Sequence, residues 1–115
     1  MKRIKGLSVA LLTPFDSNGN IKLDFLKKHI DLLVNAGTES IFILGTTSEV
    51  MLLKIEERKI LTEKILEYVN GKIDVFVQTG GFSTELSCEL SDHAEQAGAS
   101  GIGILSPSYY GYEQK

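Results

Sequence analysis

Hydroxyl side chains gather in the run Gly45-Thr46-Thr47-Ser48-Glu49, which directly follows an apolar stretch of the sequence. Glycine lets the backbone turn sharply and approach a ligand closely, and adjacent hydroxyl and backbone N–H groups can hold an anion. The run has no lysine or arginine and lacks the G-x-x-x-x-G-K spacing of phosphate-binding loops, so it favours a carboxylate over a polyphosphate. A second interpretation is that these Ser and Thr side chains cap the next helix and satisfy its free amides.

Tyrosines form a second group, because Tyr109, Tyr110 and Tyr112 crowd the end of the last apolar stretch. A phenol there could donate a hydrogen bond or relay a proton. Clustered tyrosines also form plain interface surface, since they bury large areas at modest entropic cost. From residue types alone, the interface is the simpler interpretation of the tyrosines. A structural role is likewise the simpler interpretation of Glu49, whose charge suits a helix start.

Other reactive residue types lack partners at useful spacing. His29 and His93 fall inside expected helices with no carboxylate or cysteine at metal-ligand spacing, so no metal site is expected. Cys88 is the only cysteine, which fits a reducing cytoplasm, and we expect it to be a small core residue. The pair Gly80-Gly81 lacks the G-x-G-x-x-G order of a dinucleotide-binding loop.

Composition excludes several classes of protein. The chain has 115 residues, 43% of them hydrophobic, and a formal net charge of -3, which is typical of one soluble domain without a basic surface for nucleic acid. No apolar stretch approaches the roughly 20 residues of a membrane span. The basic N-terminus has no small-residue cleavage pattern after it, so it is a poor signal peptide and a cytoplasmic location is expected.

Hydrophobic periodicity predicts strands and helices in alternation. Apolar runs at 7–12, 41–44, 75–77 and 101–105 are typical of buried strands. Between them, apolar residues at three- and four-residue steps predict helices that begin near Leu23, Glu56 and Thr84. Glycines at 37, 71 and 98 mark the helix ends, and either Ser83 or Thr84 can cap the third helix.

This order of elements predicts a parallel sheet with helical crossovers, either doubly wound or closed into a barrel. In both architectures ligands bind at the carboxyl ends of the strands. The candidate loops follow the strands, so they would share that edge. A barrel takes about 250 residues, so this chain would supply its first half.

Three of these loops resemble a known family. The runs Thr13-Pro14-Phe15, Gly45-Thr46-Thr47-Ser48-Glu49 and Ser106-Pro107-Ser108-Tyr109-Tyr110, in this order, resemble the motifs of the dihydrodipicolinate synthase and N-acetylneuraminate lyase family over essentially the whole chain. The resemblance implies an α/β fold, the (β/α)8 TIM barrel. Residues 1–115 would then be the N-terminal half of the domain, with about the first four strands and three helices.

The resemblance also implies a chemistry. Members of this family are class I aldolase-type lyases that condense or cleave pyruvate through a Schiff base on a lysine, and we expect no metal or other cofactor. Thr46 and Thr47 would bind the pyruvate carboxylate. Tyr109 would reach across a dimer interface and join a hydroxyl relay with Thr46 of the neighbouring subunit, which implies a homo-oligomer.

The same resemblance places the Schiff-base lysine on the sixth strand and a second catalytic tyrosine after the fifth, both beyond Lys115. The lysines at 54, 59, 64 and 72 belong to helix or connecting segments, so none is expected to take that role. The chain alone would therefore be inactive. Ser48 stands where the family more often has glycine, and we expect its side chain to narrow the carboxylate pocket.

The expected function is that of dihydrodipicolinate synthase in lysine biosynthesis, acting on pyruvate and an aldehyde. N-acetylneuraminate lyase and 2-keto-3-deoxy-sugar-acid aldolase are close alternatives. A different class of alternative is a non-catalytic half-barrel that binds or assembles through exposed strand edges. Because unpaired edges associate readily, self-association is expected in either case.

Overall fold

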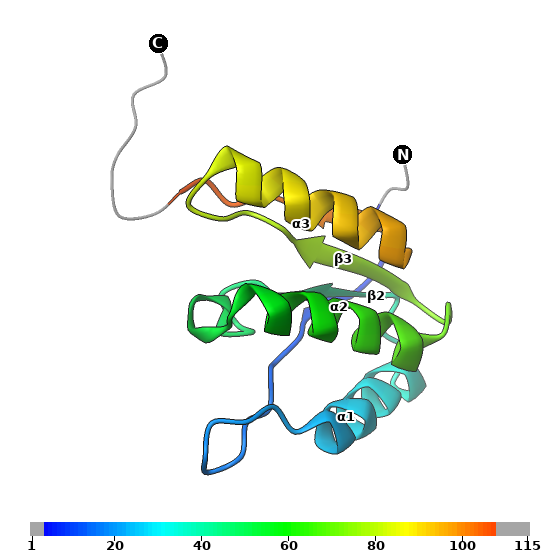
Figure 1. Ribbon diagram of the computed structural model, residues 1–115. Helices are drawn as coiled ribbons and strands as arrows, with labels where there is room; N and C mark the ends of the chain where they lie inside the picture. Colours follow the sequence, from blue (N-terminus) through cyan, green and yellow to red (C-terminus); the bar gives the residue numbers. More distant parts are fainter. Residues whose placement is uncertain (1–3, 108–115) are drawn as a thin grey trace.

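The structure is a computed structural model that describes residues 4–107 of the chain (Figure 1). Strands and helices alternate along these residues, and a short 3-10 helix precedes α2. The strands are β1 Ser8–Ala10, β2 Ser40–Ile43, β3 Asp74–Gln78 and β4 Gly101–Gly103. The helices are α1 Leu23–Asn35, η1 Val50–Leu52, α2 Ile55–Val69 and α3 Thr84–Ala97.

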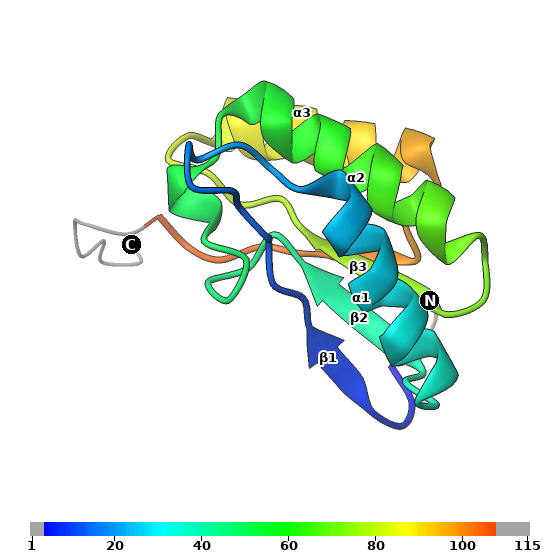
Figure 2. The ribbon, with the colours of Figure 1, turned by 90° about the horizontal axis from the view of Figure 1, so that it is seen from below.

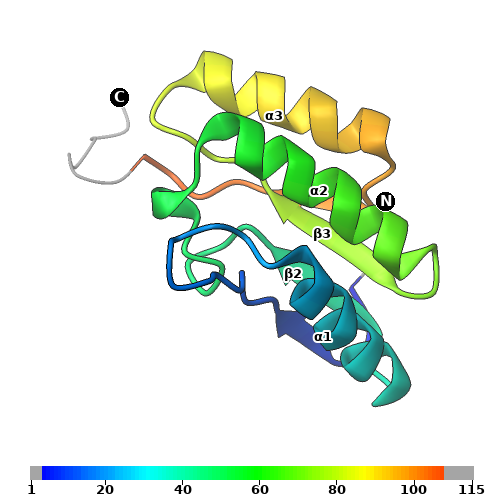
Figure 3. The same ribbon diagram turned by 60° about the horizontal axis from the view of Figure 1, so that its bottom comes forward.

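The four strands form one parallel sheet in the order β1-β2-β3-β4. Figure 2 shows β1, β2 and β3 side by side in this order. All three α-helices lie on the same side of the sheet, and α2 packs between α1 and α3 (Figure 3). A doubly wound sheet would reverse its strand order and carry helices on both faces. The (β/α)8 barrel fold predicted from the sequence is therefore confirmed, with four consecutive strands among residues 4–107.

The hydrophobic core lies between the sheet and the helix layer. Ile41 and Ile43 of β2 and Val75 and Val77 of β3 are each 2% exposed or less. The helix side chains in the same buried cluster include Leu26, Ile30, Leu61, Ile65, Val69 and Ala94. Each fully buried aliphatic side chain contributes about 1.5–3 kcal/mol. This packing holds the strands, and so the loops that follow them, in fixed relative positions.

The opposite face of the sheet pairs large side chains with glycines. Phe42 of β2 is in register with Phe76 of β3, and Phe76 is in register with Gly101 of β4. A Cβ at Gly103 would lie 2.8 Å from Cε2 of Phe42, closer than real side chains approach. The rings therefore occupy the space that side chains at Gly101 and Gly103 would need. Interdigitating side chains of this kind fill the interior of a barrel.

Three strands are shorter or shifted relative to the sequence prediction. The run 7–12 forms strand only at Ser8–Ala10, and Leu7 and Leu12 are 63% and 55% exposed. The second strand ends at Ile43 because Leu44 has a φ of 59°, which leaves the extended region. The fourth strand ends at Gly103 instead of 105. An apolar run marks a strand but not the residue where the backbone turns away.

Helix ends follow local hydrogen bonding. Ser83 caps α3, because its hydroxyl accepts a hydrogen bond from the N–H of Leu86 at 3.1 Å. The sequence alone left Ser83 and Thr84 as alternatives. Helix α2 begins at Ile55, one residue before the expected Glu56, and the carboxylate of Glu57 accepts a hydrogen bond from the N–H of Lys54 at 2.8 Å.

Cys88 is exposed, so its predicted place in the core was wrong. The buried residues of α3 are Leu90 and Ala94, which lie four residues apart on one face. Cys88 is two residues before Leu90, about 200° away around the helix. In residues 4–107 no helix combines the length and the apolar character needed to cross a bilayer.

Candidate active site at the carboxyl ends of the strands

The loops that follow β2, β3 and β4 meet at one edge of the sheet, as the sequence predicts. They line a pocket of about 610 Å³ together with the first turns of α2 and α3. Thr46 and Glu49 come from the loop after β2, Gly80 and Gly81 from the loop after β3, and Ser106 from the segment after β4. Thr46 therefore lies on the pocket wall, whereas Thr47 beside it is exposed without lining the pocket.

The loop after β2 is built from two overlapping turns between two left-handed residues. Leu44 has a φ of 59° and Glu49 a φ of 56°. Between them, the N–H of Ser48 donates to the carbonyl of Gly45 at 3.1 Å, and the N–H of Glu49 donates to the carbonyl of Thr46 at 3.0 Å. This geometry brings Thr46 and Thr47 to the corner of the loop, where both residues are exposed.

Neither helix after this loop is capped by its hydroxyls. The residue before α2 is Lys54, and the residue before η1 is Glu49, which makes no side-chain cap hydrogen bond. The helix-capping interpretation of the hydroxyl run is therefore wrong. The run forms a loop of its own, separated from α2 by η1.

Ser48 does not narrow the pocket, contrary to the prediction from the sequence. Its side chain is only 3% exposed and points into the protein. The hydroxyl accepts a hydrogen bond from the N–H of Leu44 at 3.0 Å and donates one to the carbonyl of Leu11, just beyond β1. Ser48 therefore joins the ends of the first two strands beneath the threonine corner.

Arg58 is a pocket residue that the sequence analysis missed. Only 5% of it is exposed. One terminal nitrogen donates to the carbonyl of Gln78 at 3.2 Å, to the side-chain oxygen of Gln78 at 3.2 Å and to the carbonyl of Gly80 at 3.1 Å. Burial lowers the pKa of the guanidinium, because the charged form loses hydration. Its spacing in the sequence could have revealed its burial, because Arg58 precedes the buried Leu61 and Ile65 by three and seven residues and so lies on the same face of the helix.

The Nε atom of Arg58 is buried and has no hydrogen-bond partner. Its neighbouring nitrogen is held by neutral oxygens at the carboxyl end of β3. Arg58 therefore places a positive charge on the wall of the pocket that also contains Thr46. Residues 45–49 contain no lysine or arginine. Arg58 supplies a positive charge near them, and this charge favours an anion at this edge of the sheet.

The loop after β3 is fixed by the loop after β4. A Cβ at Gly80 would lie 2.6 Å from the backbone carbonyl oxygen of Leu105, so a side chain cannot fit there without a backbone shift. Thr79, which is fully buried, donates its backbone N–H to the carbonyl of Gly103 at 2.9 Å. Gly80 is thus required by close backbone packing, and the two loops form one unit of the site.

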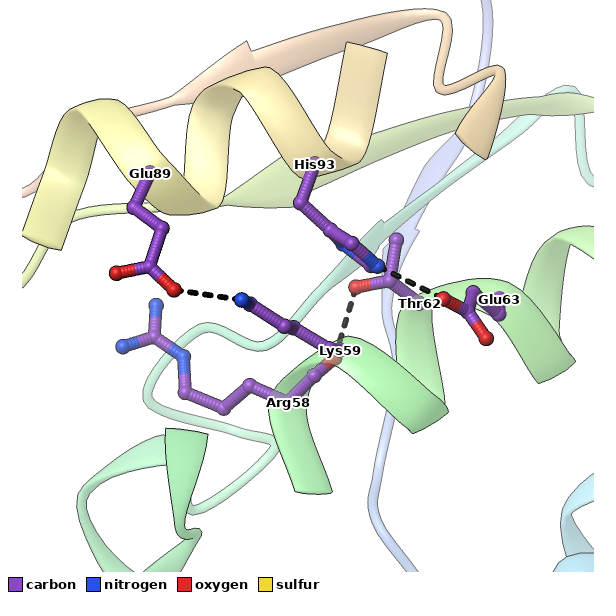
Figure 4. Close-up of polar contacts among 6 residues, drawn as sticks. All are labelled: Arg58, Lys59, Thr62, Glu63, Glu89 and His93. Carbon is purple, nitrogen blue, oxygen red and sulfur yellow. Dashed lines mark hydrogen bonds and ion pairs between the residues drawn. The ribbon is translucent and has the colours of Figure 1, made fainter. Parts of the chain in front are cut away.

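Lysines in the described part of the chain lie outside the pocket. Figure 4 shows Lys59 of α2 bound to Glu89 of α3, at an N–O distance of 2.6 Å. The carboxylate of Glu63 is 2.8 Å from a ring nitrogen of His93 in the same interface. These pairs join α2 to α3 on the outer surface of the helix layer. Among residues 4–107 no lysine lines the pocket.

Tyr109, together with Tyr110, Tyr112 and Ser108, lies outside the described residues. Its predicted role at an interface therefore stays a prediction. Within residues 4–107, no group of three His, Cys, Asp or Glu side chains is placed to hold a metal ion.

The parallel strand order, the single helix layer and the loops gathered beyond the strand ends define the chain as part of a (β/α)8 barrel. The chain belongs to the dihydrodipicolinate synthetase family, whose model matches residues 3–115. This confirms the family resemblance that the loop motifs suggested.

Relatives with two different names are similar to the chain. The N-acetylneuraminate lyase of Xenopus tropicalis is 41% identical over 110 residues, which is 94% of this chain and 36% of the relative. The 4-hydroxy-tetrahydrodipicolinate synthase of Bacillus velezensis is 38% identical over 106 residues, 92% of this chain and 37% of the relative. The chain thus spans just over a third of the length of these relatives.

Among solved structures, the fold is similar to that of YagE from E. coli K12, a prophage protein of the dihydrodipicolinic acid synthase family in complex with pyruvate. The TM-score is 0.90 at 33% sequence identity, and the match covers 94% of this chain and 36% of YagE.

Proposed function

We propose that this chain forms the carboxylate-binding part of a pyruvate-dependent lyase that acts through a lysine Schiff base. The observation that carries the proposal is the exposed corner of Thr46 and Thr47 at the carboxyl edge of a barrel sheet, on a loop without lysine or arginine. Such a corner suits a small monocarboxylate, because neutral donors can satisfy one negative charge. The family membership and the pyruvate complex of YagE support pyruvate as that acid.

In this proposal, Thr46 and Thr47 hold the pyruvate carboxylate with hydroxyl and backbone N–H groups. The carboxylate anchor orients the carbonyl carbon toward the amine of a lysine, which adds to it and expels water to form an iminium. The iminium withdraws electrons from the bond that forms or breaks. Tyr109 of a neighbouring subunit takes part in a hydroxyl relay with Thr46 that moves protons to and from the substrate.

The lysine itself is proposed to lie beyond Lys115, and residues 1–115 to be the N-terminal part of the catalytic domain. For the second substrate, we propose an aldehyde condensed with pyruvate, as in 4-hydroxy-tetrahydrodipicolinate synthase. Cleavage of a sugar acid to pyruvate is the second candidate, and the 41% identity to an N-acetylneuraminate lyase favours it. Release of pyruvate from added N-acetylneuraminate by the complete enzyme would favour the second candidate over the first.

Calorimetric titration of pyruvate into the full chain tests the carboxylate site. Thr46→Val removes a hydroxyl that would donate a hydrogen bond to the charged carboxylate. We expect the variant to bind pyruvate at least about tenfold more weakly than the wild type does. Thr84→Val is the matched control, since Thr84 is exposed at the start of α3 and outside the pocket, and its affinity should equal that of the wild type. Equal affinities for all three proteins would contradict the site.

A second titration uses pyruvamide, which keeps the carbon skeleton and replaces the carboxylate with a neutral amide. The proposal predicts much weaker binding of pyruvamide than of pyruvate. Similar binding of both compounds would show that the carboxylate is not what the loop recognises.

Borohydride reduction tests the location of the lysine. Because no lysine of residues 4–107 lines the pocket, the full chain incubated with pyruvate and borohydride should keep its mass. A reduced pyruvate adduct mapped to a lysine of this chain would overturn the proposed location beyond Lys115.

A further inference from the structure

Ser48 is a buried hydroxyl that joins two strand ends directly beneath the threonine corner. It is 3% exposed, accepts a hydrogen bond from the N–H of Leu44 and donates one to the carbonyl of Leu11. These two partners are themselves buried, at 2% and 1% exposure. The single hydroxyl therefore satisfies a backbone donor and a backbone acceptor that would otherwise need an internal water.

The bond to Leu44 stabilises an unusual backbone conformation. Leu44 has a φ of 59°, and the left-handed region is unfavourable for a residue with a Cβ. Leu44 directly follows the last residue of β2, where the ladder with the neighbouring strands ends. The Ser48 hydroxyl, four residues further along the chain, accepts a hydrogen bond from the N–H of Leu44.

The same bond closes a ring around the proposed binding residues. Leu44 and Ser48 are the two ends of a five-residue segment whose middle holds Gly45, Thr46 and Thr47. Within this ring the N–H of Ser48 also donates to the carbonyl of Gly45. The bond to Leu11 fixes the ring against β1. The orientation of the threonine corner thus depends on one side chain that does not reach the pocket.

We propose that Ser48 is a positioning residue, whose hydroxyl holds Thr46 and Thr47 in the orientation that binds the carboxylate of the substrate. This inference rests on the proposed function, because it deepens the role of the same loop. It assigns a role in ligand affinity to a side chain that itself never touches the ligand. A purely structural role would change the stability of the chain and leave the affinity of the folded protein unchanged.

The test is a pyruvate titration of the full chain, followed through the backbone amide NMR signals of Thr46 and Thr47. Ser48→Ala removes both hydrogen bonds, and we expect the dissociation constant for pyruvate to rise about tenfold. Ser48→Thr keeps the hydroxyl and should restore most of the affinity. Because the signals of folded molecules are followed, a loss of stability alone does not move this dissociation constant.

Ser40→Ala is the matched control. Ser40 is 2% exposed at the start of β2, and its hydroxyl has no hydrogen-bond partner, so its removal should leave pyruvate affinity unchanged. If Ser48→Ala does not fold, Ser48→Cys replaces it, because the thiol keeps the shape and forms weaker hydrogen bonds. Weaker pyruvate binding by Ser48→Cys is then the expected result.

The outcomes separate the two proposals. If wild type binds pyruvate at Thr46 and Thr47, and Ser48→Ala or Ser48→Cys binds it equally well, the positioning role is overturned and the carboxylate site remains. If pyruvate does not shift the Thr46 and Thr47 signals of the wild type, the proposed function itself fails.

Discussion

The guanidinium of Arg58 is held by oxygens of neutral groups at the carboxyl end of β3. One nitrogen has three oxygen acceptors, from the backbone and side chain of Gln78 and the backbone of Gly80. Hydrogen bonds from a charged donor are stronger than those between neutral groups. Arg58 therefore anchors the first turn of α2 to the strand end that forms one side of the pocket.

Replacing Arg58 with methionine keeps most of the volume and removes every donor. We expect Arg58→Met to lower the free energy of unfolding by about 2 kcal/mol, because buried carbonyls lose their partner. Urea unfolding followed by circular dichroism measures this change. Lys59→Met is the control, since it breaks only a partly exposed ion pair and should cost less than about 1 kcal/mol. Equal stability of Arg58→Met and wild type would contradict the anchoring role.

Some residues of the candidate site could be predicted from the sequence, and others could not. The residue types of Thr46 and Thr47 predicted an anion-binding loop after the second strand. The structure shows that both threonines are exposed on that loop, and anion binding there stays a prediction. Ser48 was misplaced, because three adjacent hydroxyls look alike in a sequence. In the folded loop between the left-handed residues Leu44 and Glu49, Ser48 is buried whereas Thr46 and Thr47 are exposed.

At the scale of elements, the periodic pattern predicted the three helices and four strands well, because each buries one regular face. Their ends were less predictable. Hydrogen bonds that particular side chains accept from backbone N–H groups decide them, as with Glu57 at the start of α2 and Ser83 at the start of α3. The short helix η1 between the hydroxyl loop and α2 has only three residues and no regular hydrophobic pattern, so it was not predicted from the sequence.

The cap of α3 provides a test at this scale. Ser83→Ala removes the hydroxyl that accepts from Leu86, and we expect the free energy of unfolding to fall by about 1 kcal/mol. Thr84→Ala changes the neighbouring residue, the first of the helix, and should be nearly neutral. Thermal unfolding of both variants compares them directly. A greater loss in Thr84→Ala than in Ser83→Ala would show that the cap lies at the other residue.

At the scale of the whole molecule, β1 and β4 are the two outer strands of the sheet, and exposed apolar residues lie in or beside them. Ile102 and Ile104 at the β4 side are 45% and 61% exposed, and Leu7 at the β1 side is 63% exposed. Outer strands with such residues pair readily with another chain. We expect the purified chain to self-associate as its concentration rises, and sedimentation velocity at several concentrations measures this. A monomer at all concentrations would contradict the expectation.

At this scale, the proposal is that the loop after β2 holds the acid group in a pocket that it shares with the loops after β3 and β4. A crystal structure of the full chain with pyruvate is the decisive measurement. We expect the pyruvate carboxylate oxygens to lie about 3 Å from the Thr46 hydroxyl and the backbone N–H groups of Thr46 and Thr47. A carboxylate bound instead to Arg58, or a Thr46–Thr47 corner without pyruvate at saturating concentration, would contradict it.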